Sequence, residues 1–566
     1  MAGIRSRCAK VLAAAACAAA TVPAPGAVRG EPLRDAPVVW YAGDRNHLAE
    51  MPQERDPNLL WDGPRATLKR PVGRLLDPVR LVRRVGTVFG GDHVPAAADV
   101  NALDEVPNCA WFTNRIGLFP CTPEEAARGP GSAAGPDVSG PWTVTRAKSE
   151  GVTPGFNIRD AAGADFLVKF DPLGLPGIAT AAAVISGLIL HNAGYFVPAD
   201  VIVFFRREDL RLGDGVLFTD PGGSVRPMRE ADLDSILARV DRRPDGTYRA
   251  VSSRFLQGTP IGPFDYKGTR DDDPNDRIPH QDRRELRGLR MFAAWINHFD
   301  TKQHNSLDMV VEEDGRRYVR HHLIDFASTL GTGAFGPGRT QGWEHTVDAP
   351  AIIGRTLALG LHEDAWRRLE RPEGLPEIGF FESELFAPLE FKPLVPNSAF
   401  ANMTDRDGYW AAKIISAFRD DHLTAIVERG RYEDPRAAVH MAQVLGERRD
   451  EIARLFFDRI PPLEYFELGA GTLVFRDLGE ERGIYPGTTP VYEIRFAAVD
   501  AERNAAGWSP WRRSSVPRME GVAADTPAGV RPFLAVECRV DRGSGFGPAV
   551  RAYFSRSTGR IVGVDR

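Results

Sequence analysis

Short β-prone runs dominate the chain between about residues 141 and 205. They predict strands over 142–146, around 156–158, over 166–170 and over 201–205. Before the last of these strands, residues 178–191 form an apolar run that ends at the stop signal Asn192-Ala193-Gly194, which predicts a helix. This order of elements predicts a β-rich unit that carries one helix.

From about residue 282 the spacing of apolar residues becomes helical. A helix is predicted over 282–297, because apolar side chains recur at near-helical intervals at Leu286, Leu289, Ala293 and Ile296. Further helices are predicted from Thr404 to Phe418, from about Asp421 to Arg429, and from Pro435 to about Arg459. Their ends carry local signals, namely a capping residue at Thr404, a stop at Gly430 and a first-turn proline at Pro435.

β-structure is predicted again on both sides of this last group of helices. Residues 306–311 and 318–324 are apolar and β-prone, and Glu313-Asp314-Gly315 between them predicts a hairpin turn. Beyond about residue 468, apolar and charged residues alternate around Ile494, and further strands are predicted over 533–540, 549–554 and 560–564. We therefore expect an α+β protein whose last part, residues 468–566, is a β-sandwich-like domain.

Length and charge narrow the class of protein. A chain of 566 residues is too long for one core and predicts two or three domains. With 43% hydrophobic and 26% charged residues and a net charge of −5, the composition is that of an ordinary soluble globular protein. The charge gives no indication of binding to nucleic acid or to an anionic membrane surface.

The first residues resemble a targeting segment. Arg5, Arg7 and Lys10 precede the apolar or small-residue stretch 11–22, and cleavage is expected after Ala24 or Ala27. Residues 1–27 are thus predicted to be a signal peptide of an exported protein that is periplasmic, secreted or, through Cys17, lipid-anchored. The alternative is a cytoplasmic protein with an Ala-rich tail. No other run approaches the roughly 20 apolar residues of a membrane-spanning helix, so no integral segment is expected after signal removal.

Residues 28–140 lack long periodic runs and are predicted to be an N-terminal extension and linker, wrapped on the domain that follows. The stretch 129–141 is rich in Gly, Pro, Ser and Ala, which is typical of a linker or flexible loop. Outside the signal segment the cysteines are Cys109, Cys121 and Cys538. Cys109 and Cys121 flank a short segment and are expected to form a disulfide in an oxidising compartment.

Candidate chemistry follows the predicted helix over 282–297. The segment His298-Phe299-Asp300-Thr301-Lys302-Gln303-His304-Asn305 resembles the catalytic loop of protein kinases, H-R-D-L-x-x-x-N. The hairpin after it leads to Asp325-Phe326-Ala327, which resembles the kinase D-F-G with Ala in place of Gly. The resemblance implies that Asp300 is the catalytic base and that Lys302 faces the transferring phosphoryl group. It also implies that Asn305 and Asp325 hold Mg²⁺ or Mn²⁺.

A lysine upstream fits the same resemblance. Lys169 lies among apolar residues of a predicted strand, where an ammonium group needs an anionic partner, and the phosphates of a nucleotide would serve. The chain contains 8 Lys against 63 Arg, yet Lys stands at both positions where the kinase pattern requires it. Gly151 and Gly155 precede this strand and are expected to cover phosphates, although an ordinary hairpin loop explains them equally well.

The resemblance covers roughly residues 141–467 and is closest to divergent kinase-like families, including exported spore-coat-type and secretory-pathway kinases. It implies a two-lobed α+β domain, with a β-rich first lobe and a helical second lobe. It also implies binding of ATP or another nucleotide with a divalent metal, and transfer to a hydroxyl group of a protein or small molecule. In kinases a Glu of the helix after the strand lysine pairs with that lysine, but residues 178–191 contain no acid and Ala183 stands at the expected position. This absence, and the scarcity of ATP outside cells, favour the alternative of a catalytically inactive pseudokinase that acts as an exported binding or scaffold protein.

Overall fold

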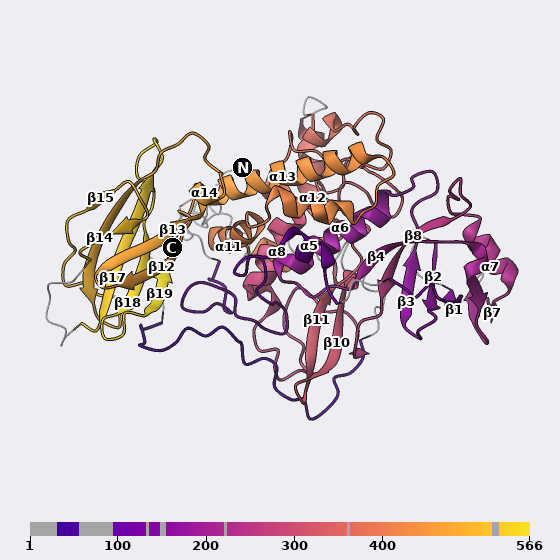
Figure 1. The fold of residues 1–566 in the computed structure, drawn as a ribbon, viewed down its shortest axis with the longest axis horizontal. Coiled ribbons are helices and arrows are strands. Elements are labelled where there is room, and N and C mark those ends of the chain that lie inside the picture. Colours follow the sequence, from indigo (N-terminus) through magenta and orange to yellow (C-terminus); the bar gives the residue numbers. More distant parts are fainter. Residues whose placement is uncertain are drawn as a thin grey trace, which may run out of the picture.

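The computed structural model describes residues 31–55, 94–131, 135–147, 154–219, 224–358, 363–522 and 531–566. Its architecture is mixed α+β. Figure 1 shows a sheet-rich end formed by residues 142–254, a helical centre, and a second sheet-rich end formed by the C-terminal residues. The predicted signal peptide over 1–27, including Cys17, and Gly151 lie outside the described residues.

The first sheet-rich part is built on one sheet. In spatial order it consists of β4 (Asp200–Phe205), β8 (Tyr248–Arg254), β3 (Asp165–Lys169), β2 (Gly155–Arg159), β1 (Trp142–Ala147) and β5 (Leu210–Leu212). Neighbouring strands are antiparallel, apart from the parallel pair β1 and β5. Strand β8 has no counterpart in the sequence prediction, because its Arg and Ser residues give it no apolar pattern and its burial comes from pairing with β3 and β4.

The two faces of this sheet bury different sets of side chains. On one face, Ile202 and Val251 pack with helix α6 (Ile178–Ala193) in the main core of the protein. On the other face, Val168 and Ala250 pack with α7 (Glu230–Leu237) in a smaller core. The short strands β6 (Leu217–Thr219) and β7 (Val225–Pro227) form a separate pair beside it.

The helical centre packs around α8 (Arg284–Trp295). The other helices of this region are α5 (Pro123–Arg128), α9 (Ala349–Leu357), α10 (Ser398–Ala401), α11 (Asp405–Ile415), α12 (Asp420–Glu428), α13 (Pro435–Phe457) and α14 (Leu478–Glu481). Short 3-10 turns occur at Arg207–Asp209, His280–Asp282, Gln303–Asn305, Ala365–Arg368 and Pro388–Glu390. Helices α8 and α11 approach closely at Gly288, where an added Cβ would lie 2.8 Å from the Trp410 ring.

The hairpin expected after the candidate loop is present. It consists of β10 (Ser306–Glu313) and β11 (Arg316–Leu323), and β9 (Thr259–Pro260) pairs with the outer edge of β10. In Figure 1 the hairpin extends from the helical centre on the side away from α13. The turn places Asp314 and Gly315 at φ values of 49° and 71°, a region that Asp and Gly tolerate well.

The C-terminal part contains two sheets. One consists of β12 (Leu463–Gly469), β13 (Thr472–Asp477) and β16 (Arg518–Met519). The other consists, in order, of β15 (Arg512–Ser514), β14 (Val491–Val499), β17 (Phe533–Asp541), β18 (Val550–Ser555) and β19 (Ile561–Asp565). Side chains of both sheets, among them Phe475 and Val536, share one hydrophobic cluster. Strand β12 begins at Leu463, before the expected boundary at 468.

The segments before β1 contact the parts that follow. Asp99 accepts a hydrogen bond from the first backbone N–H of α8, at Arg284, with an N–O distance of 2.8 Å. Phe112 is fully buried in the main core. Leu33 packs with Tyr553 in a cluster of the C-terminal sheet. These contacts tie the N-terminal segments to both the helical centre and the C-terminal part.

The expected disulfide between Cys109 and Cys121 is absent, and both thiols are free in the described structure. Cys109 is buried near Glu285, and burial is the main effect that raises the pKa of its thiol. Cys121 instead lies next to α12, since its backbone carbonyl accepts a hydrogen bond from the His422 ring at 2.9 Å. The two cysteines therefore pack against different elements, although they are close in sequence.

Within the described ranges, no helix combines the length and the apolar character needed to cross a membrane.

Candidate active site

The candidate loop begins where α8 ends. Asn297 adopts a left-handed conformation with φ of 49°, which Asn tolerates better than most residues and which ends the helix. The His298 backbone then donates a hydrogen bond to the Ala293 carbonyl at 2.7 Å, and the buried His298 ring packs edge-on against Phe326 with a centroid distance of 5.7 Å. The helix end thus places the first residue of the loop against the residue that follows Asp325.

Within the loop, Asp300, Lys302 and Asn305 are held together. The Lys302 ammonium lies 2.8 Å from one carboxylate oxygen of Asp300 and 3.1 Å from the other. The Asn305 side-chain amide donates a hydrogen bond to the Asp300 backbone carbonyl at 2.8 Å. Because the amide nitrogen of Asn305 is used in this way, its oxygen is the group that it can offer to a cation.

The hairpin returns the chain to this loop at Asp325. The Ile324 backbone N–H donates to the Asn305 carbonyl at 3.0 Å, so the residue before Asp325 lies directly beside Asn305. Asp325 itself has φ of 61°, an uncommon conformation for a residue other than glycine. Such conformations cluster at functional sites, where the surrounding structure maintains them.

Lys169 reaches Asp325 from the sheet. Its Nζ lies 3.0 Å from Asp325 Oδ1, and the Lys169 side chain is only 15% exposed. This contact joins a residue at the end of β3 to a residue that follows β11. The structure therefore brings together two candidate residues that belong to different parts of the chain.

The electrostatic environment of His298 indicates how closely the other charged groups approach. Burial lowers the pKa of His298, while Asp300 and Asp325 oppose this effect and Lys302 adds to it. All three charged groups therefore lie within electrostatic range of one imidazole ring.

Gly151 and Gly155 were both expected to cover phosphates, and the structure describes only Gly155. Gly151 lies outside the described residues. Gly155 is the first residue of β2 and pairs with Lys169 of β3. It is therefore part of the sheet next to Lys169 rather than the tip of a loop.

Helix α6 forms where it was predicted, and it carries no acid that could pair with Lys169. Ala183 is buried, and the helix contributes no acid. A different carboxylate, Asp200 at the start of β4, lies near the site and was missed by the sequence prediction. Burial raises the pKa of Asp200 to about 6, with Asp325 adding to the shift and a Ser253 hydrogen bond and Lys169 opposing it. An acid at the start of an apolar strand, next to a helix without one, was the available signal.

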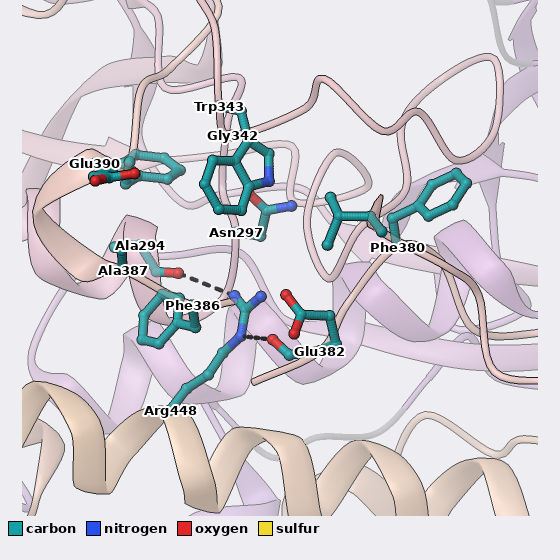
Figure 2. Close-up of a pocket in the computed structure, with 12 residues that line it drawn as sticks. Ala294, Asn297, Gly342, Trp343, Phe380, Glu382, Phe386, Ala387, Glu390 and Arg448 are labelled. Carbon is teal, nitrogen blue, oxygen red and sulfur yellow. Dashed lines mark hydrogen bonds between the residues drawn. The ribbon is translucent and has the colours of Figure 1, made fainter. Parts of the chain in front are cut away.

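A small pocket of about 20 Å³ lies behind the start of the loop and is lined by Asn297, Gly342 and Arg448, among others (Figure 2). The Arg448 guanidinium donates to the carbonyls of Ala294 at 3.3 Å and Glu382 at 2.7 Å, and burial lowers its pKa to about 9. An added Cβ at Gly342 would collide with the Asn297 amide oxygen. The pocket has room for about one water-sized group and is too small for a nucleotide. The hydrogen bond from Arg448 to Ala294 holds the end of α8 beside it.

The donor set suits a hard divalent cation. Asp325 offers a carboxylate and Asn305 an amide oxygen, and Mg²⁺ is usually bound by one or two such ligands together with phosphate oxygens of a substrate. In the described part of the chain, no cluster of three or more His, Cys, Asp or Glu side chains forms a metal site on protein ligands alone. The oxygen donors of Asn305 and Asp325 fit a divalent cation that takes its remaining ligands from phosphate oxygens or water.

The chain has low similarity to several solved kinase structures. Two are structures of the Golgi casein kinase, one of them with Mn/ADP bound, at 11% and 10% identity. These alignments cover 57% and 58% of this chain and 72% and 74% of those chains, each with a TM-score of 0.26. A third is the Helicobacter pylori proinflammatory kinase CtkA, at 11% identity over 54% of this chain and 94% of that chain, with a TM-score of 0.27. Because these values are low, the candidate site rests on its own geometry.

No family model matches the chain, and no curated protein matches it.

Proposed function

We propose that this chain is an exported, atypical kinase-like phosphotransferase. It would use ATP or another nucleotide with Mg²⁺ or Mn²⁺ to modify a hydroxyl group of a protein or small-molecule acceptor. The observation that carries the proposal is the distance of 3.0 Å between Lys169 Nζ and Asp325 Oδ1. A kinase-like arrangement requires the strand lysine and the acid after the hairpin to face the same nucleotide phosphates, and this distance places both side chains at one point.

In this proposal the sheet around β3 and the helices around α8 are the two lobes, and the C-terminal sheets form an additional domain. Lys169 binds the phosphates of the nucleotide, and Asn305 and Asp325 hold the metal. A bound divalent cation would neutralise charge on the phosphates. Asp300 accepts the proton of the acceptor hydroxyl group, and Lys302, which contacts Asp300 at 2.8 Å, offsets negative charge on the transferring group.

A second candidate is a pseudokinase that binds a partner without transfer. The observation that favours it is the absence of any acid in α6, the helix that covers the Lys169 side of the sheet. In this alternative the protein keeps the fold but catalyses no transfer, whether or not it binds a nucleotide. A transfer assay distinguishes it from the first proposal, because a pseudokinase transfers no phosphoryl group to any acceptor.

Replacement of Asp325 by asparagine tests the site. Asn tolerates the positive φ at this position, so the backbone is kept while the negative charge is removed. Mutation of a residue that only orients a metal ligand typically lowers metal affinity by about 10- to 100-fold. Loss of the direct ligand should therefore weaken metal-dependent nucleotide binding by at least that factor. Calorimetry with ATP and Mn²⁺, repeated in excess chelator, measures the effect. Asp314→Asn at the exposed hairpin turn is the matched control, and equal affinity in Asp325→Asn and wild type would contradict the assignment.

Export is tested on the native protein. The basic residues Arg5, Arg7 and Lys10, followed by the apolar stretch 11–22, lead us to expect that the mature chain begins between Ala18 and Glu31. Sequencing of the N-terminus from native cells and their medium measures this directly. A chain recovered with Met1 intact would remove the export proposal and leave the site proposal unchanged.

A further inference from the structure

We infer that Asp200, at the start of β4, is the carboxylate that positions Lys169 for phosphoryl transfer, in place of the acid that α6 lacks. This inference rests on the proposed function. It assigns a role to a residue outside the kinase-like motifs, and it follows from the register of the sheet and from the contacts of α6.

The register places Asp200 and Lys169 on the same face of the sheet. Lys169 pairs with Val251 across the β3–β8 ladder, and Val251 pairs with Ile202 across the β8–β4 ladder. Asp200 pairs with Ser253, two residues from Val251 on the same strand. Directly paired residues, and residues two apart on one strand, direct their side chains to one face. Because Ile202 and Val251 pack with α6, this is the face that α6 covers (Figure 1).

Helix α6 leaves space for Asp200 instead of supplying an acid. Gly187 of α6 is the residue that lies over Asp200, since a Cβ added there would come 3.9 Å from Asp200 Oδ2. The same Cβ would lie 3.5 Å from the Phe326 ring, next to Asp325 in the chain. The Asp200 carboxylate therefore occupies the space between the sheet, α6 and the segment that carries Asp325.

Asp200 is held in place and interacts with both charged residues of the ion pair. The Ser253 hydroxyl donates a hydrogen bond to Asp200 Oδ1 from the neighbouring strand. Lys169 favours the ionised form of Asp200 and Asp325 disfavours it, so the carboxylate lies within range of both. A carboxylate within electrostatic range of a largely buried ammonium group offsets part of the cost of keeping that charge out of water.

The chemistry explains why a second carboxylate is required. Asp325 is now the partner of Lys169, at 3.0 Å. If Asp325 binds a cation during the reaction, its charge is shared with the metal and its hold on Lys169 weakens. Asp200 lies on the same face, is not expected to ligate the metal, and remains available to Lys169. The lysine then keeps one carboxylate partner in both states.

The test is a double-mutant cycle between the two residues. Asp200→Asn, Lys169→Met and the double variant are compared with wild type by kcat and KM for ATP, and by the melting temperature. We expect Asp200→Asn to lower kcat/KM by about 10- to 100-fold, the range for loss of an interaction with a charged group. The double variant should be no slower than Lys169→Met alone, because both changes disable the same lysine. A residue with only a structural role would give additive losses and a lower melting temperature.

A matched control is Asp165→Asn on the same sheet. Its carboxylate pairs with Arg159 at 2.9 Å on the exposed surface of β3, so its removal should leave kcat/KM unchanged. If Asp200→Asn fails to fold, Ser253→Ala carries the test, because it removes the hydrogen bond that fixes Asp200 and keeps the carboxylate. A fall in kcat/KM of Ser253→Ala that disappears in the Lys169→Met background supports the inference, and no fall overturns it.

The outcomes separate this inference from the proposed function. Wild-type protein that neither binds nucleotide with Mn²⁺ nor transfers phosphate contradicts the proposed function itself. Wild-type protein that transfers phosphate, with Asp200→Asn equal to it in kcat/KM, overturns the role of Asp200 alone. Additive losses in the double variant overturn it as well.

Discussion

Asp300→Asn should lower the rate of phosphoryl transfer by about 10²- to 10⁴-fold, the usual contribution of a general base. Asn has nearly the same shape as Asp, so the hydrogen bond from Asn305 to the backbone carbonyl of residue 300 should remain, at its present 2.8 Å. The proton of the acceptor hydroxyl would then have no carboxylate to receive it. Nucleotide affinity should stay near that of wild type, because the base acts on the acceptor rather than on the phosphates. A labelled-nucleotide transfer assay beside calorimetry measures both properties.

The control for this experiment is Asp314→Asn, the same chemical change at an exposed hairpin turn. It should transfer phosphate at the wild-type rate. Transfer by Asp300→Asn at the wild-type rate would contradict the role of Asp300. Absence of transfer in the wild-type protein, across protein and small-molecule acceptors, would instead favour the pseudokinase alternative.

Lys413→Met should destabilise the protein by about 3–5 kcal/mol, the typical cost of removing one partner from a buried ionic network. Lys413 of α11 is almost fully buried, and its ammonium contacts Glu105 and, at 3.2 Å, Glu464 of β12. Arg566 also reaches Glu464, at 2.7 Å. Burial lowers the pKa of Lys413 and Glu464 opposes this effect. Without the ammonium group, Glu105 would remain buried beside Glu464 with too little positive charge.

Urea unfolding of the wild-type and variant chains measures this effect, as a lower midpoint at an unchanged slope. Lys392→Met is the matched control. Lys392 pairs at 2.7 Å with Asp348, which is buried, but Lys392 itself is 39% exposed, so water screens this pair and its loss should cost less than the loss of Lys413. Equal losses of stability in the two variants would mean that the network around Lys413 contributes no more than this half-exposed pair.

This network also explains how three distant segments are joined. Glu105 lies in the segment before the first sheet, Lys413 lies in the helical centre, and Arg566 directly follows strand β19 of the C-terminal part. The loss of Lys413 should therefore loosen the attachment of the N-terminal segment and the C-terminal sheets together. Faster hydrogen exchange in both regions of Lys413→Met, with little change around β2 and β3, is the expected pattern.

Elements with strong local signals were predicted well. Thr404 caps α11 with the reciprocal hydrogen bonds to Asp407 that its sequence predicts, and Pro435 begins α13. The strands of the hairpin and the strands β14, β17, β18 and β19 also lie close to the ranges predicted for them from β-prone or alternating residues. Each of these signals is contained within a few consecutive residues, so the physical cause of the element can be read locally.

Elements whose burial depends on distant partners were missed or predicted incorrectly. Strand β8 contains Arg249 and Ser252, which resemble loop residues, and becomes a central strand because β3 and β4 pair with both its edges. The disulfide between Cys109 and Cys121 was wrong because spacing along the chain says nothing about the elements against which each cysteine packs. The ionic network around Lys413 was not anticipated for the same reason.

The sequence by itself determined the elements that have strong local signals and the spacing of Asp300, Lys302, Asn305 and Asp325 along the chain. It also determined that α6 carries no acid, which is a property of consecutive residues. Only the tertiary structure decided that Lys169 meets Asp325 and that Asp200 lies on the same face of the sheet as Lys169. Those placements depend on strand register and helix packing between residues far apart in the chain. The contacts that fix them form only when the whole core assembles, so no short stretch of sequence contains their physical cause.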